Sequence, residues 1–207
     1  QFNNELFSKQ VWNEKVQAAL DESNFINNFT NQINHDNINE AINSLGLTRV
    51  YFIITGSSAS ASELVINSLS AYIDVKLIGT KTVGKQVGSI TLYDSDNLTR
   101  NGDNLNQNHQ YAIQPIVFEI KNKDDQNYPN GIVPGVTLPG IELAENYGNL
   151  GVLGERSDPL LDRTLLYIST GARFSNQSKI DASKTIEIFN SKLATPSRNE
   201  MYVEFKK

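Results

Sequence analysis

The feature that most constrains this chain of 207 residues is a strand, turn, helix, strand pattern between residues 49 and 79. Residues 49–55 (RVYFIIT) are a continuous apolar run, which predicts a buried strand. Residues 61–73 follow a serine-rich turn and carry apolar side chains at three- and four-residue spacing, which predicts a helix. Residues 75–79 (VKLIG) predict the next strand. This order indicates a parallel sheet covered by helices, so the predicted fold class is α/β.

The composition excludes several classes of function. The formal net charge of -5 comes from carboxylates spread along the chain, and no basic stripe offsets them, so we expect no nucleic-acid partner. The absence of cysteine excludes disulfides, thiolate metal sites and a cysteine nucleophile. The two histidines, His35 and His109, lie in polar stretches where they are expected to be solvated. We therefore expect no metal and no cofactor.

The other predicted elements follow from the same spacing rules. An amphipathic helix broken by polar turns is predicted over residues 5–29. A short helix, capped by Asp36 or Asn37, is predicted over residues 38–45. Further along, strands are predicted over residues 88–93 and 111–120, a polar loop over 95–108, an irregular segment over 122–140, a helix from Ser157 to Gly171 with Pro159 in its first turn, and a late strand over 201–205.

A serine stands at the turn between the first strand and its helix. Ser60 follows the buried strand and precedes the helix, so its hydroxyl is held clear of the sheet while nearby backbone amides point outward. Such amides can bind an oxyanion, and the amide of Ala61, directly after the serine, is the natural donor. The plainer interpretation is that the serine only caps the helix, which is the usual role of serine before a helix.

Lys85, in the segment TVGK at residues 82–85, is the candidate base for Ser60. A serine nucleophile needs a base, and the usual histidine is nearly absent from this sequence. Lysine is ordinarily protonated, but apolar surroundings disfavour the ammonium form, and Ile78 and Val83 lie close in sequence. A neutral lysine could accept the serine proton and later protonate the leaving amine. Taken singly, a glycine-lysine pair is more often a solvated loop.

Residues 79–86 (GTKTVGKQ) also come close to a phosphate-binding loop. That motif needs a serine or threonine after the lysine to bind magnesium, and Gln86 stands there. It also needs a helix after the lysine, whereas residues 87–92 predict a strand. Nucleotide binding is therefore the weaker interpretation of the same lysine.

Residues 56–64 (GSSASASEL) and 77–85 (LIGTKTVGK) together resemble the core of the C-terminal processing peptidases, also called tail-specific proteases. In that family the nucleophile is the serine before Ala-Ser-Glu, and the base is the lysine of a Gly-Lys pair 25 positions later. Those positions hold Ser60 and Lys85. The resemblance extends from about residue 2 to about residue 170 and includes residues 128–134 (YPNGIVP) and 157–161 (SDPLL).

The resemblance implies a fold and a function. The implied fold is a core of repeated β-β-α units, like that of Clp protease and crotonase, with covering helices and without its N-terminal part. Residues 1–174 would be the C-terminal portion of the catalytic domain and residues 175–207 an extension. The implied function is a serine endopeptidase that cleaves proteins near their C-termini. The sequence is most similar to lipoprotein-type members from Bacteroidota-like bacteria, which implies the periplasm or cell envelope and a lipid anchor on the parent protein.

The sequence departs from the family pattern at three points. A third catalytic residue would be an Asp where this chain has Ala71 or a Gln where it has Ser89. We therefore expect a dyad, with Ser89 as the one candidate orienting group. The glycine-rich strand end that gives the second oxyanion donor, and the peptide-docking PDZ domain, would both precede Gln1, in the same parent chain or another. The alternative function is a catalytically incomplete fragment or pseudo-peptidase that binds extended peptides by strand addition.

Overall fold

The computed structural model describes residues 1–171, all within the first of the two units into which the chain divides, Gln1–Arg173. The predicted boundary at residue 174, the C-terminal extension and the strand predicted over residues 201–205 lie outside the described residues. Within the described part, the fold is mixed α/β, with small sheets and few helices. No helix there is long and apolar enough to cross a membrane.

A three-stranded parallel sheet in the order β11-β6-β5 holds the predicted strand, turn, helix, strand unit. Strand β5 (Arg49–Ile54) pairs in parallel with β6 (Asp74–Gly79), and helix α2 (Ala61–Ser70) connects them. Strand β11 (Gly140–Glu142) adds to the other side of β6, also in parallel. The two strands and the helix predicted between residues 49 and 79 are therefore confirmed.

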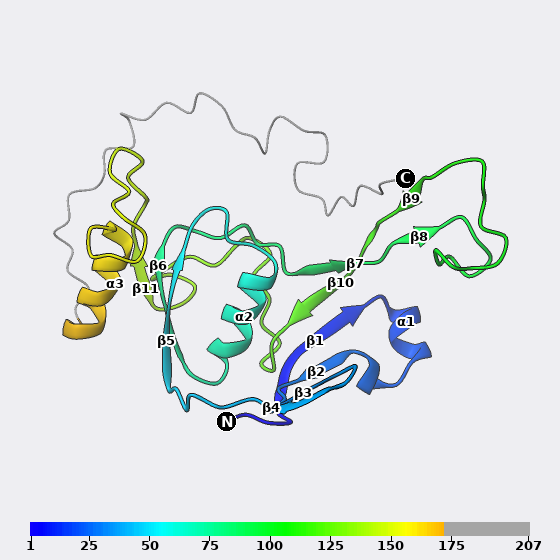
Figure 1. Ribbon diagram of the computed structural model, residues 1–207, viewed down its shortest axis with the longest axis horizontal. Helices are drawn as coiled ribbons and strands as arrows, with labels where there is room; N and C mark the ends of the chain where they lie inside the picture. The colour runs from blue at the N-terminus through cyan, green and yellow to red at the C-terminus, as the bar shows by residue number, and fades with distance from the viewer. Residues whose placement is uncertain (172–207) are drawn as a thin grey trace. The chain divides into compact units, whose positions relative to one another are not determined.

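Helices cover both faces of this sheet (Figure 1). Alternate side chains of β5 and β6 explain why: one set packs against α2 and the other against α3 (Pro159–Thr170). The α2 side is the larger cluster, built on Ile54, Ile66, Val75, Leu77 and Ile132. The α3 side is built on Ile78, Leu160 and Tyr167, with Tyr51 edge-on to Tyr167 at 5.7 Å. A sheet buried on both faces accounts for the continuous apolar runs in the sequence.

A second sheet is antiparallel and has the order β2-β1-β10-β7. It contains β1 (Leu6–Trp12), β2 (Ile26–Asn28), β7 (Val87–Ser89) and β10 (Ile116–Lys121). Two hairpins are separate from it: β3 (Gln32–His35) with β4 (Ile38–Ala41), and β8 (Leu92–Tyr93) with β9 (Ala112–Ile113). The short helix α1 (Glu14–Ala19) and the 3-10 turn Glu22–Asn24 link β1 to β2.

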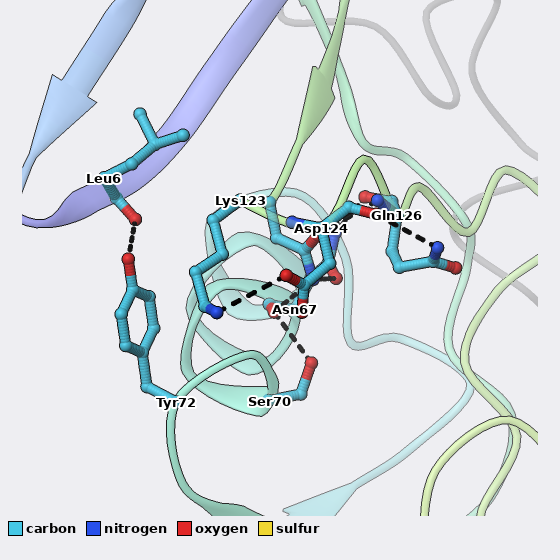
Figure 2. A network of polar contacts seen from close by, with 8 residues as sticks. Leu6, Asn67, Ser70, Tyr72, Lys123, Asp124 and Gln126 are labelled. Atoms are coloured by element: carbon cyan, nitrogen blue, oxygen red, sulfur yellow. Dashed lines mark hydrogen bonds and ion pairs between the residues drawn. The ribbon is translucent and has the colours of Figure 1, made fainter.

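Helix α2 also connects to the antiparallel sheet. Figure 2 shows Tyr72, just beyond the helix, donating a hydrogen bond of 2.7 Å to the backbone oxygen of Leu6 in β1. The Tyr72 ring packs on Phe2 at 4.7 Å and edge-on to Phe29 at 5.3 Å. The ammonium of Lys123 lies 4.9 Å from the centre of the same ring. Aromatic contacts and one polar anchor thus fix β1 beside the helix that carries the candidate nucleophile at its other end.

The helix predicted over residues 5–29 is wrong for most of its length. Only Glu14–Ala19 is α-helical, and the flanking segments are β1 and β2. The helix predicted over residues 38–45 is also wrong, because residues 38–41 form β4 of a hairpin. Asp36 does not cap a helix; it has a φ of +52° in the turn of that hairpin. Short polar residues serve both helix caps and tight turns, and the two uses look alike in sequence.

The predictions for the remaining segments are confirmed with adjusted boundaries. The strand predicted over residues 111–120 is split into β9 and β10, and Pro115, which cannot donate a ladder hydrogen bond, stands between them. Strand predicted over residues 88–93 is likewise split into β7 and β8. Helix α3 begins after Asp158, whose Oδ1 accepts from the amides of Leu160 and Leu161, and ends at Gly171 with a φ of +64°.

Candidate active site

Ser60 lies in the turn between β5 and α2, with an unusual backbone conformation. Its φ is +53° and its ψ is -114°, a combination that residues with a side chain rarely adopt. The turn before it is closed by Ser58, whose amide donates to Thr55 O and whose hydroxyl accepts from Thr55 N, both at 3.0 Å. The side chain of Ser60 is exposed. A strained, exposed serine between a buried strand and a helix has the geometry of a nucleophile elbow.

Ala61 is the first residue of α2, so its amide belongs to the first helical turn. The first four amides of a helix have no acceptor within the helix, and they carry the positive end of its dipole. In α2 the first bond of the α-helical type runs from Leu64 N to Ser60 O, at 2.8 Å, after a bond of the 3-10 type from Ser62 N to Ala59 O at 3.2 Å. This end of the helix is therefore suited to stabilise negative charge that develops beside Ser60.

The lysine loop, residues 80–86, is held against this turn. The amide of Val83 donates to Ser58 O at 2.9 Å, which joins the loop to the serine turn directly. Thr82 is buried and pairs with Ile132: its amide donates to Ile132 O at 3.1 Å, and its hydroxyl accepts from Ile132 N at 2.7 Å. Backbone bonds on both sides therefore fix the segment that leads to Lys85.

Two glycines bring the lysine loop onto the segment YPNG at residues 128–131. Gly84 has a φ of +88°, and a Cβ there would lie 2.3 Å from Pro129 O. Gly131 has a φ of +86°, and a Cβ there would lie 2.2 Å from Thr82 O. Both positions need a positive φ and both have backbone where a side chain would begin, so only glycine fits without displacement.

One buried carboxylate connects the serine turn and the lysine loop. Glu63 in α2 has no exposed surface, and its two oxygens accept four hydrogen bonds. Its Oε2 accepts from the amides of Ser60 (3.0 Å) and Lys85 (2.8 Å). Its Oε1 accepts from the amide of Gly84 (2.7 Å) and from the hydroxyl of Thr82. The backbones of Ser60 and Lys85 are thus bonded to the same atom, although 25 positions separate them.

A second polar connection follows Lys85. Lys85 itself is half-buried, and Gln86 is 2% exposed. The Oε1 of Gln86 accepts from Asn67 Nδ2 at 2.8 Å, so the residue after Lys85 is bonded to the middle of α2. Asn67 in turn donates to Gln126 O at 2.8 Å and accepts from Asn122 Nδ2 at 2.9 Å. The helix that carries Ser60 is therefore bonded to both sides of Lys85.

The structure brings the turn of Ser60 and Ala61 together with the loop of Lys85, but it places Ser89 in a different setting. Ser89 lies in β7 of the antiparallel sheet, where its hydroxyl accepts from Gln114 Nε2 at 3.2 Å. Ala71 ends α2 and has no polar side chain. His35 and His109 each lie beside an aspartate on a loop or hairpin, at 2.9 Å from Asp36 and 3.2 Å from Asp94. The orienting role of Ser89 stays a prediction.

The phosphate-loop interpretation of Lys85 is not supported by the structure. Residues 87–89 after it form strand β7, where a phosphate loop needs the N-terminus of a helix. Gln86 is buried and bonded to Asn67. Within residues 1–171, no group of three or more histidine, aspartate or glutamate side chains could hold a metal ion.

Sequence reasoning missed Glu63 and Thr82 as parts of this site. The spacing Ser60-x-x-Glu63 is that of a capping box, in which the glutamate accepts from the amide of the first residue, so the bond to Ser60 could have been expected. The bonds from Thr82, Gly84 and Lys85 could not, because they cross 19 to 22 positions of sequence. Only the folded loop brings those donors to the carboxylate.

The fold and the turn geometry together define an α/β protein with a serine elbow facing a glycine-lysine loop. The sequence matches no protein-family model and no curated protein. Among solved structures, the chain is similar to the "Putative S41 protease from Bacteroides fragilis NCTC 9343", with a TM-score of 0.56 and 21% sequence identity over 82% of this chain. It covers 38% of that longer chain. The likeness shows that this chain has the fold of part of a protein described as a protease.

Proposed function

We propose that this protein is a serine endopeptidase that cleaves protein substrates near their C-termini. Ser60 is the nucleophile, Lys85 is the general base and acid, and the amide of Ala61 is an oxyanion donor. The observation that carries the proposal is the shared carboxylate oxygen of Glu63, which accepts from the amides of both Ser60 and Lys85. This shared acceptor holds the serine turn beside the lysine loop, as a joint catalytic role of the two residues requires.

In the proposed reaction, Lys85 accepts and releases a proton in each of two successive half-reactions. The neutral Nζ of Lys85 takes the proton of Ser60 Oγ while that oxygen attacks the substrate carbonyl carbon. The carbonyl oxygen becomes an oxyanion at the N-terminus of α2, where the Ala61 amide can donate to it. When the C–N bond breaks, the Lys85 ammonium protonates the leaving amine. Lys85, neutral again, then takes a proton from water as the water oxygen attacks the acyl carbon, and it returns that proton to Ser60 Oγ when the ester bond breaks.

The setting of this reaction is also a proposal. Resemblance to tail-specific proteases supports a core of the Clp protease and crotonase type, completed by a preceding segment with a second oxyanion donor and a PDZ domain. That segment lies in the same parent chain or in another. The same resemblance supports a place in the bacterial periplasm or cell envelope, on a lipid-anchored parent protein. Substrates would be proteins or peptides with an accessible C-terminus.

Turnover by matched variants tests the proposal. The parent protein is incubated with an unfolded substrate protein, and cleavage near the substrate C-terminus is followed by mass spectrometry. We expect Ser60→Ala and Lys85→Ala to lower the rate by at least ~10³-fold, the scale found when one member of a catalytic serine site is removed. Two controls, Ser62→Ala in α2 and Lys81→Ala in the lysine loop, change exposed neighbours and should retain the rate. Retained cleavage in either dyad variant would refute the assignment.

A binding function without catalysis is the second candidate. Among residues 1–171, strands β5 and β7 end their sheets, so each has an edge that could accept an extended peptide. Fluorescence anisotropy with extended peptides tests this function. Peptide binding by a protein that shows no Ser60-dependent cleavage would favour it, and cleavage would exclude a purely binding role.

A further inference from the structure

We infer that Glu63 is a positioning residue that sets the geometry between Ser60 and Lys85. This inference rests on the proposed function, because it concerns how the two residues of that dyad are kept in reach of one another. Glu63 touches neither the substrate nor the reacting atoms in this role. It acts through the backbones of the two residues that do, as the bonds of its Oε2 indicate.

The first step of the argument concerns the conformation of Ser60. A residue with a side chain at φ +53° keeps that conformation only where surrounding contacts require it. The bond from Ser60 N to Glu63 Oε2, at 3.0 Å, fixes the orientation of the peptide that precedes the strained residue. Without it, the backbone of Ser60 could relax from this conformation, and its hydroxyl would lose the orientation that the turn gives it.

The second step concerns the lysine loop. Lys85 N and Gly84 N both donate to the carboxylate, at 2.8 Å and 2.7 Å, so two consecutive peptides are aimed at one side chain. Gly84 takes a φ of +88° to make this possible. These bonds to Glu63 therefore fix the backbone of Lys85 relative to α2, and the position from which its side chain extends is fixed with it.

The third step concerns the chemistry of the side chain. All four donors are uncharged, three of them backbone amides, and each carboxylate oxygen receives two. An ionised carboxylate is an acceptor only and can hold four such bonds, whereas an amide side chain of the same shape must point an NH₂ group at two of the four donors. The site is thus built for glutamate, and glutamine should disturb it with little change in volume.

Amide hydrogen exchange, followed by NMR in the 207-residue chain, tests the inference without any need for activity. The variants are Glu63→Gln and Ile66→Ala; Ile66 is 1% exposed in the same helix, and its apolar side chain accepts no hydrogen bond, so its truncation lowers stability without removing an acceptor from either loop. In Glu63→Gln we expect the amide of Ser60, Gly84 or Lys85 to exchange at least ~10-fold faster than in Ile66→Ala, which corresponds to one lost acceptor. The inference would be overturned if each of the three amides exchanged at the same rate in Glu63→Gln as in the unmodified chain.

Reactivity of Ser60 toward a fluorophosphonate gives the second readout. Glu63→Gln should lower the maximal labelling rate at least ~10-fold and change the half-saturating probe concentration less than threefold, the mark of lost positioning and not of lost binding. Ile66→Ala should label within threefold of the unmodified chain. A labelling rate in Glu63→Gln equal to that of the unmodified protein would overturn the inference. These labelling rates are measured in the parent protein; if Ser60 is not labelled in the unmodified parent protein, the proposed function fails, and hydrogen exchange alone decides the role of Glu63. Should Glu63→Gln not fold, Thr82→Val replaces it, and unchanged exchange at Gly84 then counts against the inference.

Discussion

At the scale of single residues, the backbone of Ser60 makes a prediction about stability. A positive φ at a residue with a Cβ costs about 1–2 kcal/mol, and glycine adopts such a conformation without that cost. Ser60→Gly should therefore be more stable than Ser60→Ala by about 0.5–1 kcal/mol, after allowance for the greater freedom of glycine in the unfolded chain. Urea unfolding of the two variants measures the difference. An alanine variant as stable as the glycine variant would show that the serine turn is not strained in solution.

Glu63 and Thr82 are two residues of the site whose roles could not be predicted from the sequence. Ser60 and Lys85 could be proposed from the sequence because their residue types and spacing suit acyl transfer, and their catalytic roles stay predictions. Glu63 was predictable only as the end of a capping box, and Thr82 only as part of a loop. Their common role depends on the contact of residues 80–86 with the first turn of α2, which follows from the fold and has no local signature.

At the scale of elements, the close contact between the lysine loop and residues 128–131 predicts a large effect of one methyl group. Gly84→Ala would put a Cβ 2.3 Å from Pro129 O, at a φ of +88°. We expect a loss of about 3 kcal/mol or more in the free energy of unfolding, because the strain of the conformation adds to the collision with backbone. Thermal or urea unfolding measures it.

Gly154 provides the matched control for this substitution. It has a φ of +86°, almost the same as Gly84, but no atom lies within 4 Å of a Cβ placed there. Gly154→Ala should therefore cost only the conformational part, about 1 kcal/mol. If both alanine variants lose the same amount of stability, Gly84 is not as close to Pro129 O in solution as it is in the structure.

The elements also show why local patterns succeed for some segments and fail for others. Helix α3 was predictable because Asp158, Pro159 and Gly171 mark its two ends. Strand β1 was not, because aromatic residues pack on both of its faces, so it shows no polar and apolar alternation. Phe7 packs on Phe29 at 5.0 Å and Trp12 on Phe118 at 4.8 Å. Strand pairing with residues far along the chain decided its structure, and apolar spacing read within 25 residues cannot detect such pairing.

At the scale of the whole described part, Tyr72 connects α2 to the antiparallel sheet and makes stability depend on pH. Burial raises the pKa of Tyr72, and the nearby carboxylates of Glu5 and Asp124 raise it further. The neutral phenol is thus favoured in the folded state. Its contribution is complete below the unfolded pKa of about 10 and is lost as the pH rises through the higher folded value.

Tyr72→Phe tests this contribution. The variant loses the hydrogen bond to Leu6 O and should be about 1 kcal/mol less stable than the unmodified chain at pH 7. Because only the unmodified chain can lose the contribution at alkaline pH, the difference between the two proteins should shrink above pH 10. The free energy of unfolding, measured from pH 7 to pH 11, gives the result. A difference that stays constant over that range would contradict the shifted pKa.

The central claim for the whole molecule is that two segments of sequence, joined through one buried carboxylate, form a reactive serine with a lysine as its base. The most direct measurement is the site and rate of fluorophosphonate labelling, read by peptide mass spectrometry in the unmodified protein, Lys85→Ala and Lys81→Ala. The account predicts one labelled residue, Ser60, with labelling lost in Lys85→Ala and kept in Lys81→Ala. Labelling of Ser60 at an equal rate in all three proteins, or labelling of another serine, would contradict it.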